Sequence, residues 1–344
     1  MEHWITSQAA QLPTLLLIGI TAVCLVVLSK GADILVNEAV SLSVRWGIPK
    51  IVIGATIISI GTTAPEAAVS VAAAVSGRPD IALGNAVGSI ICDTSMIIGI
   101  AALIRPLPSQ RSVTDKQAWI HLGSALLLVL IALPWSSIGK GLFQTGTFPQ
   151  WAGFLFLALL ALYLYRTVKS SRNSEEASGL PEETAIEDPE SSATPVVFLK
   201  LLFGLALIVV SSRVLIPAVE ETAFRAGIPQ SVIAATLVAF GTSLPELVTA
   251  VTASRRGHGE LAIGNIIGAD ILNVLFVVGA SAAVTPGGLA VPQQFYWFHF
   301  PVMLSVVLIF RLTLLSRSGT VGRIPGALLL LFYIAFVILS YTVI

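Results

Sequence analysis

Ten long apolar stretches alternate with short polar segments along the chain. Each stretch is long enough for a helix that crosses about 30 Å of hydrocarbon. The stretches fall near 14–30, 47–75, 81–104, 118–135, 150–166, 196–216, 228–254, 261–284, 296–315 and 324–343. The first is expected to be a retained span rather than a signal peptide, because no basic segment precedes it. The pattern predicts an all-α transmembrane protein of ten helices.

Composition supports a multi-pass membrane protein. Of the 344 residues, 55% are hydrophobic and 11% are charged, with zero formal net charge, whereas soluble domains carry about 25% charged residues. We expect the lipid bilayer as the main partner, with no nucleic acid, no obligate protein partner and no resident cofactor. Cys24 and Cys92 form no CxxC pair or Cys/His cluster, which argues against a disulfide framework and a zinc site. The four histidines are scattered near span ends: His3, His121, His258 and His299.

Basic residues are distributed unevenly between the two sides of the predicted spans. About fifteen Lys and Arg residues fall on one side and about four on the other. Because cytoplasmic loops are enriched in Lys and Arg, the richer side is predicted to face the cytoplasm. Both termini then lie outside the cell inner membrane, and the segment 167–195 lies in the cytoplasm.

The segment 167–195 separates two five-span halves, 1–166 and 196–344. It is rich in Ser, Glu and Pro and poor in bulky apolar residues, so we expect a disordered acidic linker. Its acids do not follow the spacing of an EF-hand calcium loop, which favours a solvated tether over a calcium sensor.

The two halves share an ungapped internal repeat. Residues 47–104 align with residues 227–284 at a constant offset of 180, and roughly 21 of 58 aligned positions are identical. Because each half holds five spans, an odd number, the second copy enters the membrane from the opposite side. Such inverted-topology repeats are typical of secondary transporters, whose binding site lies near the midplane where the repeats meet.

Four acidic residues fall inside the predicted spans rather than in loops: Glu66, Asp93, Glu246 and Asp270. A carboxylate at mid-bilayer costs at least about 2.5–3.5 kcal/mol, so such residues usually serve function. Asp93 has no Lys or Arg near mid-depth in the repeated spans to pair with, which indicates a mobile cation. For Asp270, both a structural role and a role at the site are open.

Each glutamate ends a Gly-Thr-Thr/Ser-x-Pro-Glu segment, 61–66 in one copy and 241–246 in the other. The proline lacks an N–H group, so it kinks the helix and frees a backbone carbonyl beside the carboxylate. Hydroxyl groups within one turn add hard oxygen donors, from Thr62, Thr63, Thr242 and Ser243. Oxygen-only donor sets suit Ca²⁺ or Na⁺ rather than soft metals.

The next span of each repeat adds a polar stripe with a spacing of four residues, which places its members on one helix face. The first stripe is Asn85, Ser89 and Asp93, and the second is Asn265, Ala269 and Asn273. Asp270 lies on the flank of the second stripe. Glycines at 84 and 88, and at 264 and 268, are spaced so that neighbouring helices can approach closely.

The paired motifs resemble those of the calcium/cation antiporter superfamily, specifically its prokaryotic sodium/calcium exchanger family. The matching segments are GTTAPE (61–66) with GNAVGS (84–89), and GTSLPE (241–246) with GNIIGA (264–269). The resemblance implies two inverted five-helix repeats and one site that Ca²⁺ and Na⁺ occupy in turn. The implied ligands are Glu66, Glu246, Thr62, Thr63, Thr242, Ser243, Ser89, Asp93 and Asn273. The chain departs from the family pattern at Ala269, where Ser is common, and at Ile90 and Asp270, where Asn is usual.

We therefore expect a secondary antiporter, not an enzyme, that exchanges Ca²⁺ for Na⁺ by alternating access near the membrane midplane. The nearest alternative is H⁺-driven exchange of Ca²⁺ or another divalent cation at the same site, because buried carboxylates can carry protons. The hydroxyl-rich turns favour Na⁺. An intramembrane enzyme is disfavoured, because the sequence has no HExxH motif and no Ser/His or Cys/His arrangement. A channel is the remaining alternative, which sustained single-channel currents would reveal.

Overall fold

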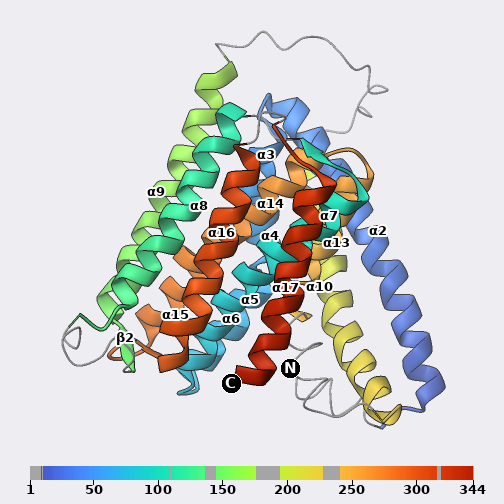
Figure 1. Ribbon diagram of the computed structural model, residues 1–344. Helices are drawn as coiled ribbons and strands as arrows, with labels where there is room; N and C mark the ends of the chain where they lie inside the picture. The colour runs from blue at the N-terminus through green and yellow to red at the C-terminus, as the bar shows by residue number, and fades with distance from the viewer. Residues whose placement is uncertain are drawn as a thin grey trace.

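The computed structural model describes residues 9, 11–108, 111–135, 145–175, 194–227, 241–315 and 319–343. Its helices form one bundle, with small antiparallel strand pairs in the connections (Figure 1). The start of the predicted seventh span, 228–240, and most of the predicted linker, 176–193, lie outside the described residues. The prediction of disorder is wrong for residues 167–175 and 194–195 of that linker, because they are helical.

The first half begins with a long helix and continues with two interrupted spans. Its elements are α2 (Thr14–Trp46), then α3 (Lys50–Ile53), η1 (Gly54–Ile58), α4 (Ser59–Thr62) and α5 (Ala64–Val75) in the second span. The third span comprises α6 (Pro79–Ile91), η2 (Cys92–Ile97) and α7 (Ile98–Ile104), where η denotes a π-helical turn. The helices α8 (Arg111–Ala132) and α9 (Gln150–Glu175) complete this half.

The second half repeats this order. Its described helices are α10 (Thr194–Arg225), α13 (Leu244–Arg255), and α14 (Gly259–Leu272), η5 (Asn273–Val278) and α15 (Gly279–Val284) in the eighth span. The last two spans comprise η6 (Phe295–His299) with α16 (Phe300–Leu314), and α17 (Arg323–Val343). The start of α2 and the end of α17 lie at the same end of the bundle (Figure 1), as an even number of spans requires.

Helices cover each of the ten predicted spans, the seventh only from residue 241. By length and apolar composition, six single helices among the described residues could cross a membrane, and the bent pair Lys50–Thr62 and Ala64–Val75 would make a seventh. The largest boundary difference is in α2, which continues past residue 30 to Trp46. Polar residues in this extension have partners, because Asp33 pairs with Arg256 at 2.7 Å and Glu38 lies 3.8 Å from Lys200.

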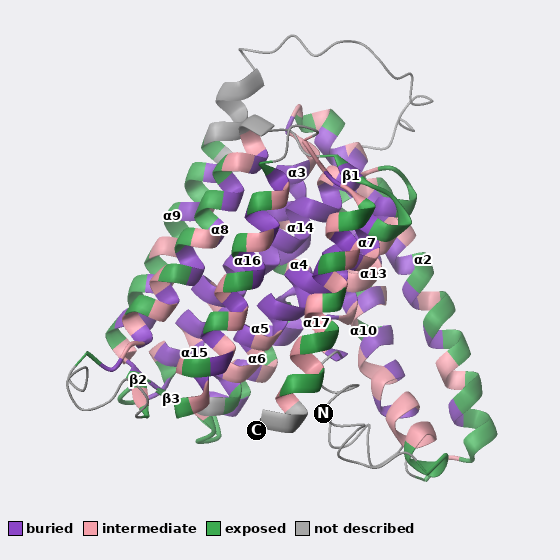
Figure 2. Ribbon diagram, viewed as in Figure 1, coloured by how far each residue is buried: buried purple, intermediate pink, exposed green. Residues whose placement is uncertain are grey.

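Two short sheets reproduce the internal symmetry. Strand β1 (Leu107–Pro108) pairs with β4 (Thr320–Val321), and β2 (Gly146–Phe148) pairs with β3 (Leu289–Val291). β1 and β3 follow the third and eighth spans, which are equivalent, and β2 and β4 precede the equivalent fifth and tenth spans. Each sheet therefore pairs a strand from one half with a strand from the other half. β1 lies near one end of the bundle and β2 and β3 near the other (Figure 2). The prediction of two inverted five-helix repeats is confirmed.

The third and eighth spans form the centre of the molecule. Of the most apolar window in each, 94% is buried for Gly259–Val284 and 78% for Ile81–Ile104, against 28% for α2 and 11% for α17. Exposed residues accordingly collect on α2, α9 and α17 (Figure 2). A Cβ atom at Gly264 would overlap the backbone of Ile51 in the second span. The absence of a side chain there therefore brings the two motif-bearing spans into direct contact.

Candidate cation site

Each predicted glutamate lies in the first turn of a helix that begins beside a proline. The second span bends by 45° between α4 and α5, where Pro65 has no N–H group to donate to the preceding turn. Pro245 occupies the equivalent position in α13. Glu66 and Glu246 are therefore near helix N-termini, where the helix dipole stabilises a negative charge.

The oxygen atoms of these carboxylates are buried and mostly lack protein partners. Glu66 and Glu246 are both 1% exposed. Both carboxylate oxygens of Glu66 and one of Glu246 receive no hydrogen bond from the described residues. The same holds for Oδ1 of Asp93, Oδ1 of Asn273 and Oγ of Ser243. Because buried oxygen atoms without partners are costly, this cluster favours a cation or water at the same place.

Hydrogen bonds connect the two motifs in symmetry-related pairs. Thr62 Oγ1 donates to Asn265 Oδ1 at 3.4 Å, and Thr242 Oγ1 donates to Asn85 Oδ1 at 3.5 Å. Each threonine thus reaches the asparagine that begins the polar stripe of the opposite repeat. The first pair is fully buried, whereas Thr242 and Asn85 are half-buried.

A further contact crosses the repeats at the glutamate itself. Thr63 of the first repeat donates through Oγ1 to Oε1 of Glu246 at 3.4 Å. Within the first repeat, Asn85 donates through Nδ2 to Ser70 Oγ at 2.9 Å and to the backbone oxygen of Glu66 at 3.4 Å. Polar groups from both halves therefore meet in one region.

The polar stripes of the third and eighth spans end at π-helical turns. Asp93 is the second residue of η2, and Asn273 is the first residue of η5. Such turns interrupt the regular backbone hydrogen bonding and are frequent at functional sites. Ser89 lies one helical turn before Asp93 and is 3% exposed.

Asp270 differs from the other intramembrane acids because it contacts a histidine. Its Oδ2 lies 3.0 Å from Nε2 of His121 on α8, and it accepts a hydrogen bond from Thr94 in η2. The expectation that His121 lies near a span end is wrong. Helix α8 begins at Arg111, so His121 is in the middle of that helix, where it is 1% exposed. Polar residues in the first turns of α8 concealed this start from the hydropathy pattern.

The arrangement offers carboxylate, hydroxyl and amide oxygens to a hard cation. Among the described residues, no three or more His, Cys, Asp and Glu side chains are placed to hold one metal ion. A complete coordination shell therefore requires the Thr, Ser and Asn oxygens as well. The buried carboxylates of Glu246 and Asp93 repel the negative charge of Glu66. A bound cation would relieve this repulsion.

The ten residues predicted for the site all lie in the described part of the chain. Nine are buried and Thr242 is half-buried. Asn85 and Asn265 were recognised only as stripe members, yet they form the bridges between the repeats. His121 and Thr94 were missed, because neither belongs to the paired motifs.

Comparisons with known proteins cover both halves. The family described as sodium/calcium exchanger protein matches residues 16–169 and 196–342. The chain is 35% identical over 317 residues to the inner membrane protein YrbG of Escherichia coli (strain K12), covering 92% of this chain and 94% of that protein. It is 33% identical over 345 residues to the sodium/calcium exchanger MaX1 of Methanosarcina acetivorans, covering 92% and 96%.

Solved structures show the same architecture. The sodium-calcium exchanger NCX_Mj, in crystals soaked with Na⁺ and Sr²⁺, superposes with a TM-score of 0.77 at 27% identity, covering 94% of this chain and 98% of that one. In crystals soaked without Na⁺ and Ca²⁺, the same exchanger gives a TM-score of 0.78 at 26% identity. These matches extend over both motif-bearing repeats.

Proposed function

Since this chain belongs to the sodium/calcium exchanger family, we propose that it is a secondary antiporter that exchanges Ca²⁺ for Na⁺ at one site shared by its two repeats. The observation that carries the proposal is the symmetric pair of bridges, Thr62 to Asn265 and Thr242 to Asn85, beside buried carboxylate oxygens that mostly lack partners among the described residues. Transport rather than an enzymatic reaction is the activity that family membership implies.

The proposed ligands for Ca²⁺ are the carboxylates of Glu66 and Glu246, one from each repeat. Ca²⁺ takes six to eight oxygen ligands, so hydroxyl, amide and water oxygens complete the shell. Na⁺ uses the hydroxyl-rich turns and the polar stripes, including Ser89, Asp93 and Asn273. Both ions need the same carboxylates, and they therefore exclude one another.

Coupling follows from the cost of an empty site. Glu66, Glu246 and Asp93 repel one another when no cation is bound, and their buried oxygens have few protein partners. A conformational change with three bare carboxylates is thus unfavourable. The protein changes its accessible side mainly when Ca²⁺ or Na⁺ is bound, which links the two fluxes.

Alternating access is proposed to involve the long helices α2 and α10. These helices form the most extensive helix pair, and they cross where Gly31 and Gly204 meet, since a Cβ atom on either would lie 2.9 Å from the backbone oxygen of the other. The pair sits at the periphery of the bundle (Figure 1). We propose that it slides against the core while the inverted repeats exchange roles.

The proposed orientation places both termini outside the inner membrane, with the basic ends of the spans in the cytoplasm. In this orientation Asn85 and Thr242 lie toward the outer side of the site and Asn265 and Thr62 toward the inner side. The half-buried state of the first pair and the full burial of the second support a conformation that is closed toward the cytoplasm.

The test is Ca²⁺ uptake into proteoliposomes containing the purified full chain. An outward Na⁺ gradient should drive uptake in the wild type, and the Glu66→Gln/Glu246→Gln double variant should show only background. A control variant, Glu221→Gln, removes a carboxylate whose partner Arg225 lies in the same helix, and it should retain uptake. Uptake driven by a pH gradient without Na⁺ would identify H⁺ as the coupling ion and overturn the Na⁺ assignment.

A further inference from the structure

A pocket of about 910 Å³ lies between α8 and α9, away from the cation site. Its volume is in the range of small-molecule sites, about 300–1,000 Å³. Helix α8 packs mainly on α14 and α16, and α9 packs mainly on α15 and η5. The groove between the two helices is therefore left open, with Val52 of α3 and Leu275 of η5 among the residues that line it.

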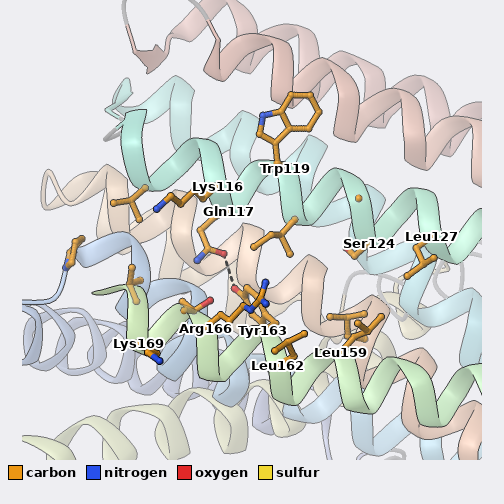
Figure 3. Close-up of a pocket in the computed structure, with 17 residues that line it drawn as sticks. Lys116, Gln117, Trp119, Ser124, Leu127, Leu159, Leu162, Tyr163, Arg166 and Lys169 are labelled. Atoms are coloured by element: carbon orange, nitrogen blue, oxygen red, sulfur yellow. Dashed lines mark hydrogen bonds between the residues drawn. The ribbon is translucent and has the colours of Figure 1, made fainter. Parts of the chain in front are cut away.

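The two ends of this groove differ in chemistry (Figure 3). Lys116 of α8 and Arg166 and Lys169 of α9 lie at one end, and all three are exposed. Leu127 and Leu159 lie toward the other end. The groove is thus apolar along its length and positively charged at one end.

Polar contacts organise the charged end. Tyr163 donates to Gln117 Oε1 at 2.9 Å and lies 3.2 Å from the backbone oxygen of Ala55, which fixes α8 and α9 to the second span. Asp115, the neighbour of Lys116, is held by Arg311 with Nη1 and Oδ1 2.8 Å apart. The acidic residue closest in sequence to Lys116 is therefore already paired with Arg311.

We propose that this groove binds one anionic glycerophospholipid of the surrounding membrane. The phosphate headgroup would contact Lys116, Arg166 and Lys169, and an acyl chain would follow the apolar walls past Ile120 and Leu162. Ile120 and Leu162 are 39% and 43% exposed, so hydrocarbon must cover them in a bilayer. Basic pockets between membrane helices favour anionic headgroups, with each Lys or Arg contributing roughly a fivefold preference.

The groove can also be filled by a substitution that leaves its charged residues unchanged. Gly123 is exposed on the groove side of α8, and a Cβ atom there would meet no atom within 4 Å. A leucine at this position would therefore occupy the groove without a clash, and it would favour the helix over glycine. Gly19 in α2 is also exposed with open space at its Cβ, so Gly19→Leu is the matched control.

The experiment is native mass spectrometry of the detergent-solubilised full chain with equimolar phosphatidylglycerol and phosphatidylcholine of identical acyl chains. The wild type should retain phosphatidylglycerol at least about tenfold better. This preference should be lost in the groove variant Lys116→Gln/Arg166→Gln/Lys169→Gln. It should be kept in a control variant that removes three charges from α2, α13 and α17, Lys30→Gln/Arg255→Gln/Arg323→Gln. Gly123→Leu should lower retention of both lipids relative to Gly19→Leu.

Several outcomes would overturn the lipid site. Equal retention of the two lipids by the wild type would exclude an anionic preference. Equal losses in the two triple variants would assign the preference to overall charge rather than to this groove. Displacement of the bound species by excess glycerol phosphate would identify a soluble phosphate compound, not a membrane lipid, as the occupant. The inference does not depend on the exchange of Ca²⁺ for Na⁺.

Discussion

The third and eighth spans are equivalent segments of the two repeats, yet each places its acidic residue differently. In the third span, Asp93 lies on the polar stripe, and its Oδ1 is buried with no hydrogen-bond partner among the described residues. In the eighth span, the neutral Asn273 occupies that stripe position. The acid there is Asp270, three residues earlier. Its Oδ1 also lacks a partner among the described residues, but its Oδ2 contacts His121 and Thr94.

This difference follows from helix register, which decides the neighbours that a buried carboxylate meets. A shift of three residues changes the direction of a side chain by about 60° around the helix axis, which is enough to turn it from one neighbouring helix to another. Oδ1 of Asp93 therefore has no protein partner among the described residues, while Oδ2 of Asp270 has a partner on α8. The two repeats share one architecture, and in the proposed site they contribute different charges.

The largest effect is expected from removing the unpaired charge. Asp93→Asn should weaken Ca²⁺ exchange by up to about a thousandfold, since unit charges about 4 Å apart interact by about 4 kcal/mol at an effective dielectric constant of about 20. Asp270→Asn should change exchange by less than about threefold, because its Oδ2 already has partners in His121 and Thr94. Initial rates of Na⁺-driven Ca²⁺ uptake against Ca²⁺ concentration measure both, and equal losses would remove the distinction between the two acids.

The second largest effect is expected on the stability of the folded protein. His121→Gln should lower the free energy of unfolding by about 3 kcal/mol, because Asp270 then keeps a buried charge without its partner. Thermal unfolding in detergent gives the change, with His258→Gln as a control at the edge of the membrane. Adding Asp270→Asn to His121→Gln should recover part of the loss. Additive losses in the double variant would mean that the two side chains do not interact.

Moving the carboxylate of Asp93 to the equivalent position of the second repeat tests whether the two stripe positions are interchangeable. Asp93→Asn combined with Asn273→Asp transfers the acid to the equivalent stripe position of the eighth span. Uptake should return to within about tenfold of the wild type, since the number of carboxylates at the site is restored. Failure of this exchange to improve on Asp93→Asn alone would show that the two stripe positions do not face one site.

The smallest effect is expected at Ala269, the counterpart of Ser89. Ala269→Ser adds the hydroxyl that the second stripe lacks. It should strengthen Na⁺ competition against Ca²⁺ by about threefold, because the hydroxyl gives Na⁺ one more contact of about the strength of a hydrogen bond. The Na⁺ concentration for half-inhibition of Ca²⁺ uptake measures it. Unchanged competition would place this position outside the Na⁺ ligands.

The sequence predicted the features that depend on local pattern. Proline at 65 predicted the bend before Glu66, proline at 245 predicted the helix start before Glu246, and the constant offset predicted the inverted repeats. It did not predict the contact between His121 and Asp270, because the two residues lie on different spans and helix rotation decides which side chains meet. The full length of α2 was also missed, since its polar extension is stabilised by Arg256 and Lys200 from distant segments.

The sequence predicts that contacts between the repeats occur in symmetric pairs, but it does not identify the bridging residues. Thr62 and Asn265, and Thr242 and Asn85, are equivalent positions exchanged between the copies. Inverted symmetry predicts that a contact in one copy recurs in the other. It does not predict which pair forms, because that depends on the distance between two helix axes.

Equilibrium binding of radiolabelled Ca²⁺ to the purified chain tests the central claim most directly. One Ca²⁺ per chain, displaced by Na⁺ and lost in either Glu66→Gln or Glu246→Gln, is the result expected of one site built from both repeats. Two independent classes of Ca²⁺ site, each abolished by only one of these substitutions, would contradict it.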